Sequence, residues 1–270
     1  MATLLEKTRK INRVLQRFHN VQYKEIATVL SNVIDANTYI VNIEGEIQGY
    51  AFQDDFECSL MVDNVVAVKK FPRHYVNWLN KIDETSANLR SKSGLCAFVD
   101  DSETPCKFHG KNTTIVPIYG VGERIGTLIV ARYNEDFTND DLLLVEYGAA
   151  VVGMEMLHDQ ARKNQEENQQ RAHVKMALRT LSFSEAVATV NIFAELDGKV
   201  GVVNASKIAD KLGITRSVIV NALRKLASAG VVFPESQGMK GTHISILNDY
   251  LIEGIAEMAK EKLILDPGKN

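Results

Sequence analysis

The side chains with the clearest chemical potential lie in residues 206–230, which read SKIADKLGITRSVIVNALRKLASAG. Arginine can donate two hydrogen bonds to O6 and N7 of guanine, and asparagine can pair in the same two-point way with adenine. Arg216 and Asn221 would share one polar face if this stretch is helical. Neighbouring lysines and arginines would contact phosphates, which fix register on a duplex without reading its sequence. The residues expected to contact DNA are Thr215, Arg216, Ser217, Asn221, Arg224, Lys225 and Lys240.

Two helices joined by a tight turn would hold this polar face outward. Ala209 offers a small residue where the helices cross, and Gly213 tolerates the positive φ that the turn requires. Thr215 is suited to the N-cap of the second helix. Residues 231–247, VVFPESQGMKGTHISIL, predict a β-hairpin with glycines at its tip, as in the wing of a winged helix-turn-helix. The apolar face of the second helix is expected to consist of Val218, Ile219, Ala222, Leu223 and Leu226.

The distribution of charge agrees with a local DNA-binding surface. The whole chain has a formal charge of −3, which excludes a protein that coats nucleic acid through overall basicity. Residues 201–245 contain six basic and two acidic side chains, a charge of +4, so the rest of the chain carries −7. The alternative is an ordinary two-helix corner with a solvated basic face, which would suit an interaction scaffold that uses the winged helix for dimerisation.

Length and composition indicate a two-domain protein. With 270 residues, 45% of them hydrophobic, the chain is long for one core and natural for two domains. Its apolar runs are shorter than the roughly 18–20 residues of a membrane span, and its N-terminus has no apolar signal-peptide core. Three cysteines, Cys58, Cys96 and Cys106, form no disulfide framework, so we expect reduced thiols and a cytoplasmic protein.

The N-terminal part predicts an antiparallel sheet with flanking helices, giving an α+β protein. An amphipathic helix is expected at residues 4–18, and two strands flank Gly45. Residues 113–133, TTIVPIYGVGERIGTLIVARY, predict a hairpin. Thr138 and Asp141 then form a capping box that opens a long helix, and Ser182 with Glu185 opens another. The expected domains are a ligand-sensing domain at 1–155, a linker helix at 156–180 and a winged helix-turn-helix at 181–270.

Several runs of residues are spread over nearly the whole chain: LLEKTRKIN, the FP pair at 71–72, TTIVPI, GERIGTLI, DDLLLVEYGAAVVGME and ITRSVIVNALRKL. Together they resemble the CodY family of global transcription regulators of Gram-positive bacteria. The resemblance implies an N-terminal GAF domain that binds branched-chain amino acids, chiefly isoleucine, with GTP as a second effector in many members. It also implies a homodimer that binds operator DNA more tightly with ligand and mainly represses metabolic genes.

The resemblance also implies an effector pocket, in which two positions depart from the family. Met61 stands where the family has an arginine that pairs with the ligand carboxylate, and Cys96 replaces a threonine. A buried carboxylate without a partner is costly. Either backbone N–H groups or Arg73 take the arginine's place, or isoleucine binds poorly. The expected pocket residues are Met61, Phe71, Pro72, Tyr75, Cys96 and Phe98.

The sequence disfavours a GTP response. It contains no phosphate-binding glycine loop, and Glu44 and Gln160 occupy positions where GTP-sensing relatives carry basic residues. Residues 80–83, Asn-Lys-Ile-Asp, resemble a guanine-reading motif but lack its context. The candidate nucleotide site comprises Asn42, Glu44 and Glu155. Whether isoleucine, valine, leucine or GTP still binds stays open, as does a repressor with an altered or lost response.

No arrangement of residues predicts catalysis or a bound metal. The glycine-rich GVGERIG lies between two strands and does not open a helix, so it predicts a turn. Cys106 and His109 form one Cys-x2-His pair without the further ligands of a metal site. We therefore expect a regulator that is not an enzyme, binds no cofactor tightly, and has DNA, a small molecule and a second copy of itself as partners.

Overall fold

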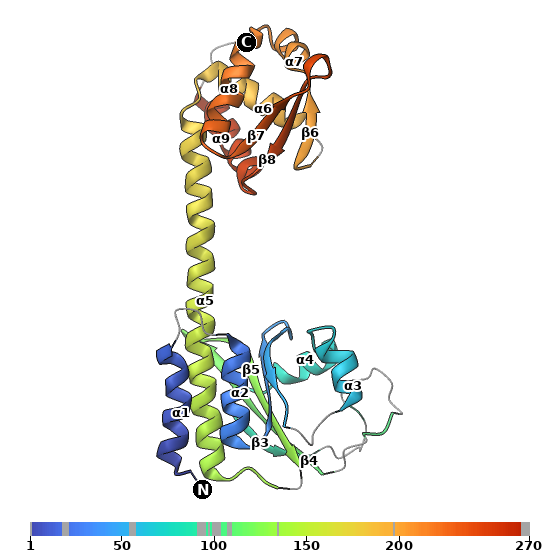
Figure 1. The fold of residues 1–270 in the computed structure, drawn as a ribbon, viewed down its shortest axis with the longest axis vertical. Helices are drawn as coiled ribbons and strands as arrows, with labels where there is room; N and C mark the ends of the chain where they lie inside the picture. The colour runs from blue at the N-terminus through green and yellow to red at the C-terminus, as the bar shows by residue number, and fades with distance from the viewer. Residues whose placement is uncertain are drawn as a thin grey trace. The chain divides into compact units, whose positions relative to one another are not determined.

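The structure is a computed structural model that describes residues 2–17, 22–53, 58–90, 96, 98, 104–106, 110–133, 135–196 and 198–265. The chain divides into two compact units, Met1–Gln160 and Ala161–Asn270. One helix, α5 (Asn139–Arg179), begins in the first unit and ends in the second (Figure 1). No helix in the described ranges is both long and apolar enough to cross a membrane.

The first unit is built on a five-stranded antiparallel sheet in the order β2-β1-β5-β4-β3. The predicted hairpin is its centre, where Thr113 pairs with Ala131 and Ile115 with Ile129. The strands are β1 (Asn37–Asn42), β2 (Ile47–Ala51), β3 (Ser86–Leu89), β4 (Lys111–Gly120) and β5 (Glu123–Tyr133).

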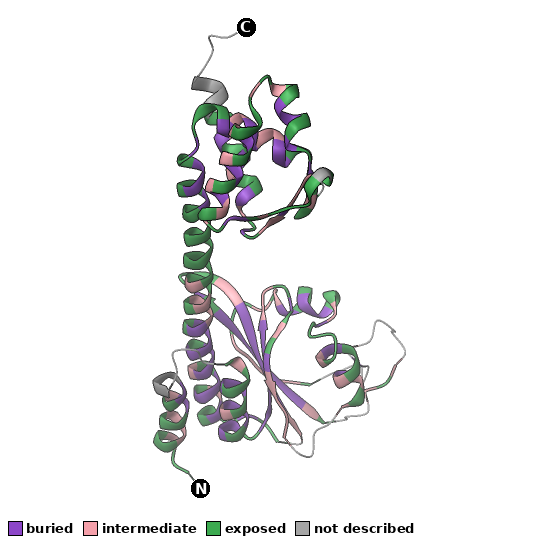
Figure 2. Ribbon diagram, turned by 45° about the horizontal axis from the view of Figure 1, so that its top comes forward, coloured by how far each residue is buried: buried purple, intermediate pink, exposed green. Residues whose placement is uncertain are grey.

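Alternation along the strands gives each face of this sheet its own apolar core. Ile40 and Leu128 point to one face, where α1 (Leu4–Arg17), α2 (Tyr23–Ile34) and the start of α5 pack (Figures 1 and 2). Their neighbours, including Tyr39, Val41 and Ile129, point to the opposite face. That face is covered by α3 (Ser59–Met61), the π-helical segment Val62–Val66 and α4 (Arg73–Leu79).

A local signal in the sequence correctly places the start of α5, and structural contacts fix the starts of α4 and α2. Thr138 and Asp141 form the predicted capping box, with each backbone N–H bonded to the other side chain. Pro72 is the N-cap of α4. Helix α2 starts against β2, because a Cβ atom on Gly49 would lie 2.5 Å from the carbonyl carbon of Tyr23. Phe18, expected at the end of the first helix, lies outside the described residues.

The second unit contains four helices besides the end of α5, together with a three-stranded antiparallel sheet in the order β6-β8-β7, counted over the described residues. Ser182 and Glu185 form the predicted capping box at the start of α6. Strand β6 was not predicted from the sequence. The elements are α6 (Phe183–Ala194), β6 (Val200–Val203), α7 (Ala205–Leu212), α8 (Arg216–Ser228), β7 (Val232–Ser236), the 3-10 turn η2 (Gly238–Lys240), β8 (Thr242–Ile246) and α9 (Leu251–Leu265).

The α+β class, the antiparallel sheet with flanking helices and the long helix are thus confirmed. The segment 156–180, predicted as a linker, begins inside α5, a single helix of 41 residues from Asn139 to Arg179. The two compact units meet within this helix, between Gln160 and Ala161.

Candidate DNA-binding surface and effector site

Helices α7 and α8 form the predicted helix-turn-helix. Gly213 ends α7 in the left-handed conformation, with φ of 63°, and the Ile214 N–H donates to the Ala209 carbonyl at 3.1 Å. Four α8 side chains are buried in the core of the second unit, which fixes the rotation of the helix and turns its other face outward. These buried residues are Ile219, Ala222, Leu223 and Leu226, while Val218 is half-buried.

The outward face of α8 carries the side chains predicted to read bases. Arg216 and Arg224 are exposed, and Asn221 is half-buried between them. Arg224 donates to Asn221 Oδ1 at 3.1 Å. The Nδ2 amino group of Asn221 remains a hydrogen-bond donor. Thr215 occupies the N-cap, but its hydroxyl pairs with Ser217 Oγ at 2.7 Å and makes no capping bond to the backbone. The face combines side chains capable of two-point hydrogen bonds with exposed cations, as major-groove contact requires.

Lys225 has protein partners that the sequence did not indicate. Its Nζ donates to Glu185 Oε2 at 2.6 Å and to the Thr180 carbonyl at 3.0 Å. Glu185 also accepts from the Ser182 N–H, so the pair joins α8 to the start of α6. The Lys225 hydrogen bond is the main reason that the pKa of Glu185 lies below its ordinary value. Lys225 therefore holds α8 in place, a role distinct from the predicted phosphate contact.

We expect Lys225→Met to destabilise the second unit by about 1–2 kcal/mol at neutral pH, since the ammonium is only partly buried. Because the folded-state pKa of Glu185 is depressed, its stabilising effect is complete above its unfolded pKa of about 4.3 and is lost on acidification. The difference between variant and wild type should shrink as the pH falls below that value. Hydrogen exchange of α6 and α8 amides measures it.

Lys211→Met is the matched control for this prediction. Lys211 Nζ lies 3.8 Å from Glu195 Oε1, and the lysine side chain is 62% exposed, so its loss should change stability by less than about 0.5 kcal/mol. Equal protection of α6 and α8 in wild type and Lys225→Met at neutral pH would contradict the assigned role.

The hairpin after α8 has the form of a wing. Strands β7 and β8 pair from Val232–Ile246 to Ser236–Thr242, and β6 extends the sheet beside β8. Gly241 has φ of 117°, and a Cβ atom there would lie 2.6 Å from the Val203 carbonyl oxygen. Lys240 is exposed at the tip, in the position expected of a phosphate contact.

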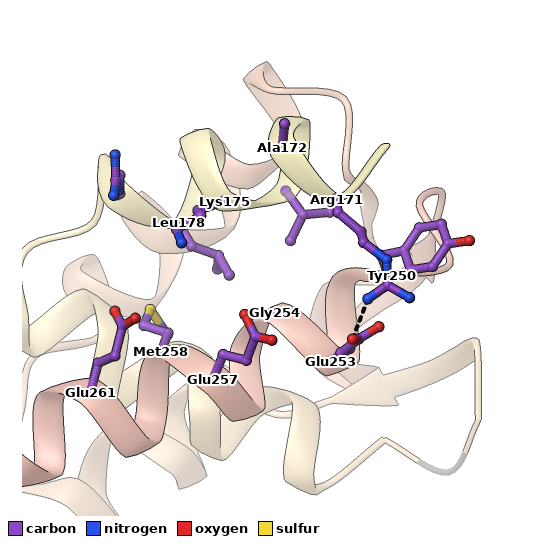
Figure 3. A pocket seen from close by; sticks show the side chains of 12 residues that line it. Arg171, Ala172, Lys175, Leu178, Tyr250, Glu253, Gly254, Glu257, Met258 and Glu261 are labelled. Carbon is purple, nitrogen blue, oxygen red and sulfur yellow. Dashed lines mark hydrogen bonds and ion pairs between the residues drawn. The ribbon is translucent and has the colours of Figure 1, made fainter. Parts of the chain in front are cut away.

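Helix α9 packs along the end of α5 within the second unit (Figure 3). The helices approach closely at Gly254, where a Cβ atom would lie 2.6 Å from Val174 Cγ1. A groove of about 270 Å³ lies along this contact. It is lined by basic residues of α5 and acidic residues of α9, namely Arg171, Lys175, Arg179, Glu253, Glu257 and Glu261. Arg171 forms an ion pair with Glu253 and lies over the Tyr250 ring, 4.3 Å from its centroid. The last turns of α5 are therefore an integral part of the second unit.

The predicted effector residues gather on the sheet face covered by α3 and α4. Phe71 and Tyr75 stack with ring centroids 5.4 Å apart, and Phe98 meets them edge-on at 5.9 and 5.4 Å. Met61 is buried in the same cluster, and Pro72 is half-buried beside Phe71. Burial raises the pKa of the Tyr75 hydroxyl, so Tyr75 is a neutral donor.

The two positions that depart from the family are also buried. Met61 is 2% exposed and Cys96 8% exposed. Arg73, considered from the sequence as a replacement cation, is exposed on the first turn of α4. A different cation lies at the cluster: Lys111, whose Nζ is 4.9 Å from the Phe98 ring centroid. Sequence reasoning missed Lys111, because a lysine preceding an apolar strand gives no signal of its surroundings.

The candidate nucleotide residues lie on two elements of the first unit. Asn42 and Glu46 exchange two hydrogen bonds across the β1–β2 turn, and Glu44 is exposed beside them. Glu155 is buried on α5. In the guanine-like motif, Asn80 donates to the Ile43 carbonyl at 3.1 Å, a contact that holds the loop.

The structure brings together one set of potential metal ligands that the sequence analysis did not note. Ligand atoms of Glu155, His158 and Asp159 on α5 lie within 4.8 Å of one another, and Asp159 accepts from the Tyr23 hydroxyl at 2.8 Å. Of the Cys-x2-His pair considered from the sequence, His109 lies outside the described residues.

A winged helix-turn-helix with a basic reading face, carried on one chain with a GAF fold, defines a transcription regulator that combines DNA binding with ligand sensing. Comparison with known families agrees: the CodY GAF-like domain matches residues 3–180 and the CodY helix-turn-helix domain matches residues 199–259. The chain belongs to the CodY family.

Named relatives match over almost the full length of this chain. Global transcriptional regulators CodY from Clostridium kluyveri and Clostridium perfringens are 49% and 48% identical, covering 96% of this chain and 100% of each relative. Among solved structures, the cofactor-binding GAF domain of the nutrient sensor CodY from Clostridium difficile is 38% identical, with a TM-score of 0.42. It covers 58% of this chain and 99% of that one. The chain is a global transcriptional regulator with a helix-turn-helix DNA-binding domain and a GAF ligand-binding domain.

Proposed function

We propose that the chain represses metabolic genes by binding operator DNA, and that a branched-chain amino acid in the first unit strengthens this binding. The observation that carries the proposal is the outward face of α8, where exposed arginines flank Asn221 on a helix fixed by its buried side. The N-terminal part of such a helix enters the major groove in related architectures. Isoleucine, valine and leucine are the proposed effectors, since the aromatic cluster of Phe71, Tyr75 and Phe98 offers an apolar wall.

We further propose that the active form is a homodimer, because one helix-turn-helix reads only half of a two-fold symmetric operator. GTP is left out of the proposal. The exposed carboxylate of Glu44 would repel a triphosphate, and the Asn42 side chain is already bonded to Glu46.

The proposal is tested with a duplex selected from a random pool by the full-length protein. Fluorescence anisotropy should show tighter binding of this duplex with isoleucine present, and log affinity should fall linearly with log salt concentration. Binding that does not depend on salt would favour the interaction scaffold. DNA binding that no branched-chain amino acid alters would retain the DNA-binding half of the proposal and remove its effector half.

A further inference from the structure

Lys111 is a cation held against the aromatic cluster of the first unit. It is the first residue of β4, paired in register with Tyr133 of β5, and its side chain is partly withdrawn from solvent. Its Nζ lies 4.9 Å from the centroid of the Phe98 ring, which itself contacts Phe71 and Tyr75. The ammonium therefore stands at the edge of an apolar surface made of three rings.

The surroundings of Lys111 disfavour its charge. Burial is the main cause of a pKa below the ordinary lysine value, and the sulfurs of Cys58, Cys96 and Cys106 oppose this shift only in part. No carboxylate in the described part of the chain forms an ion pair with Lys111. Lys70, an exposed lysine of the same unit, lies 3.5 Å from Glu46 Oε1. A desolvated ammonium without a counterion is stabilised by any anion that reaches it.

The chemistry next to this cation specifies what kind of anion would fit. A carboxylate at Nζ would place a short attached chain against the rings of Phe98, Phe71 and Tyr75, which are within 6 Å of one another. Those rings offer apolar area to a branched aliphatic group. Met61, buried in the same cluster, adds a flexible apolar side chain to this surface.

We propose that Lys111 Nζ binds the carboxylate of a small branched aliphatic acid whose side chain lies against Phe71, Tyr75 and Phe98. This assignment rests on the proposed effector response, and it supplies from β4 a cation that the buried Met61 side chain cannot provide. The shared chemistry covers both branched-chain amino acids and their 2-oxo acids. The lysine contributes the ion pair, and the rings contribute shape and apolar contact.

Calorimetric titration of the full-length protein tests this with L-isoleucine, its 2-oxo acid, and L-isoleucinol, which lacks the carboxylate. Wild type should prefer the acids to isoleucinol. Lys111→Met should weaken binding of the acids about 10- to 100-fold, the range of one charged hydrogen bond, and leave isoleucinol nearly unchanged. Lys111→Arg should recover part of the affinity. Comparing the affinities for L-isoleucine and for its 2-oxo acid shows which of the two classes of acid the site prefers.

Two controls separate a binding role from a folding role. Lys81→Met, at an exposed lysine of the same unit, should bind like wild type. Lys111→Met without ligand should melt at the same temperature as wild type or higher, because the variant no longer buries a charge, while ligand-induced stabilisation is lost.

The outcomes distinguish this assignment from the proposed function. Wild type that binds isoleucine, with Lys111→Met showing the same affinity and the same preference over isoleucinol, overturns the role of Lys111 and keeps the effector response. Wild type that binds neither acid overturns both. Loss of binding in Lys111→Met together with a lower melting temperature would also count against the role, because it would trace the effect to folding.

Discussion

Arg216→Ala is expected to reduce the preference of the protein for its selected duplex over random duplex by about 1–3 kcal/mol. Arg216 is the first residue of α8 and is exposed, and the first residues of a recognition helix are those that reach base edges. Asn221→Ala should cost a similar amount at a different base pair, and it also removes the acceptor that holds Arg224. Competition titrations of each variant with selected and random duplexes give the ratio directly.

Lys240→Ala is the control for base reading. Because Lys240 lies at the tip of the wing, it should weaken binding to both duplexes equally and reduce the slope of log affinity against log salt by about one. If Arg216→Ala and Asn221→Ala behaved in this uniform way, or like wild type, α8 would not be the reading helix.

Phe71→Ala is expected to destabilise the first unit by about 3–5 kcal/mol, the cost of removing a buried phenyl ring together with the cavity that remains. Phe71 is 3% exposed and its ring contacts those of Tyr39, Tyr75 and Phe98. Removing it takes away the centre of the aromatic cluster, so binding of any effector there should be lost as well. DNA binding without effector should persist, because the second unit has its own core.

Urea unfolding followed by tryptophan fluorescence isolates this effect. The chain has one tryptophan, Trp78, which lies on α4 with its ring 5.4 Å from that of Tyr75 and so reports on the first unit. Val68→Ala is the control, since Val68 is 66% exposed and its truncation should be nearly neutral. If Phe71→Ala unfolded with the same urea midpoint as wild type, the aromatic cluster would not be part of the folded core.

The sequence was sufficient wherever a local pattern determines the structure. Spacing alone places the buried face of α8, and two capping boxes correctly place the starts of α5 and α6. Strand β6 could not be predicted from local pattern, because it is only four residues long and contains Gly201. It forms by pairing with β8, which lies more than forty residues later in the chain. Its glycine has a tertiary cause: a Cβ atom there would lie 2.5 Å from a methyl carbon of Leu196.

The roles of single cations could not be predicted, because they depend on distant partners. Lys225 belongs by spacing to the polar face of α8, yet its ammonium is bonded to Glu185, forty residues earlier. Lys111 shows the converse. No pattern within β4 distinguishes it from a solvated lysine at the start of a strand, and only its position over Phe98 reveals an apolar environment. Counting charges along the sequence therefore located the DNA-binding region but could not predict the contacts that each basic residue makes.

The middle of α5 has a consequence for how the two units influence each other. Residues 163–169 are all exposed (Figure 2), a span of roughly 10 Å at 1.5 Å per residue, whereas Gln170 and Arg171 bond to Asn248 and Glu253 of the second unit. A helix of this length is marginal in water by itself, so its winding depends on nucleation by the packed turns on either side. Loosening of either end shifts the helix–coil equilibrium of the whole segment. If the proposed effector response travels along α5, its strength is limited by the probability that these exposed turns are helical.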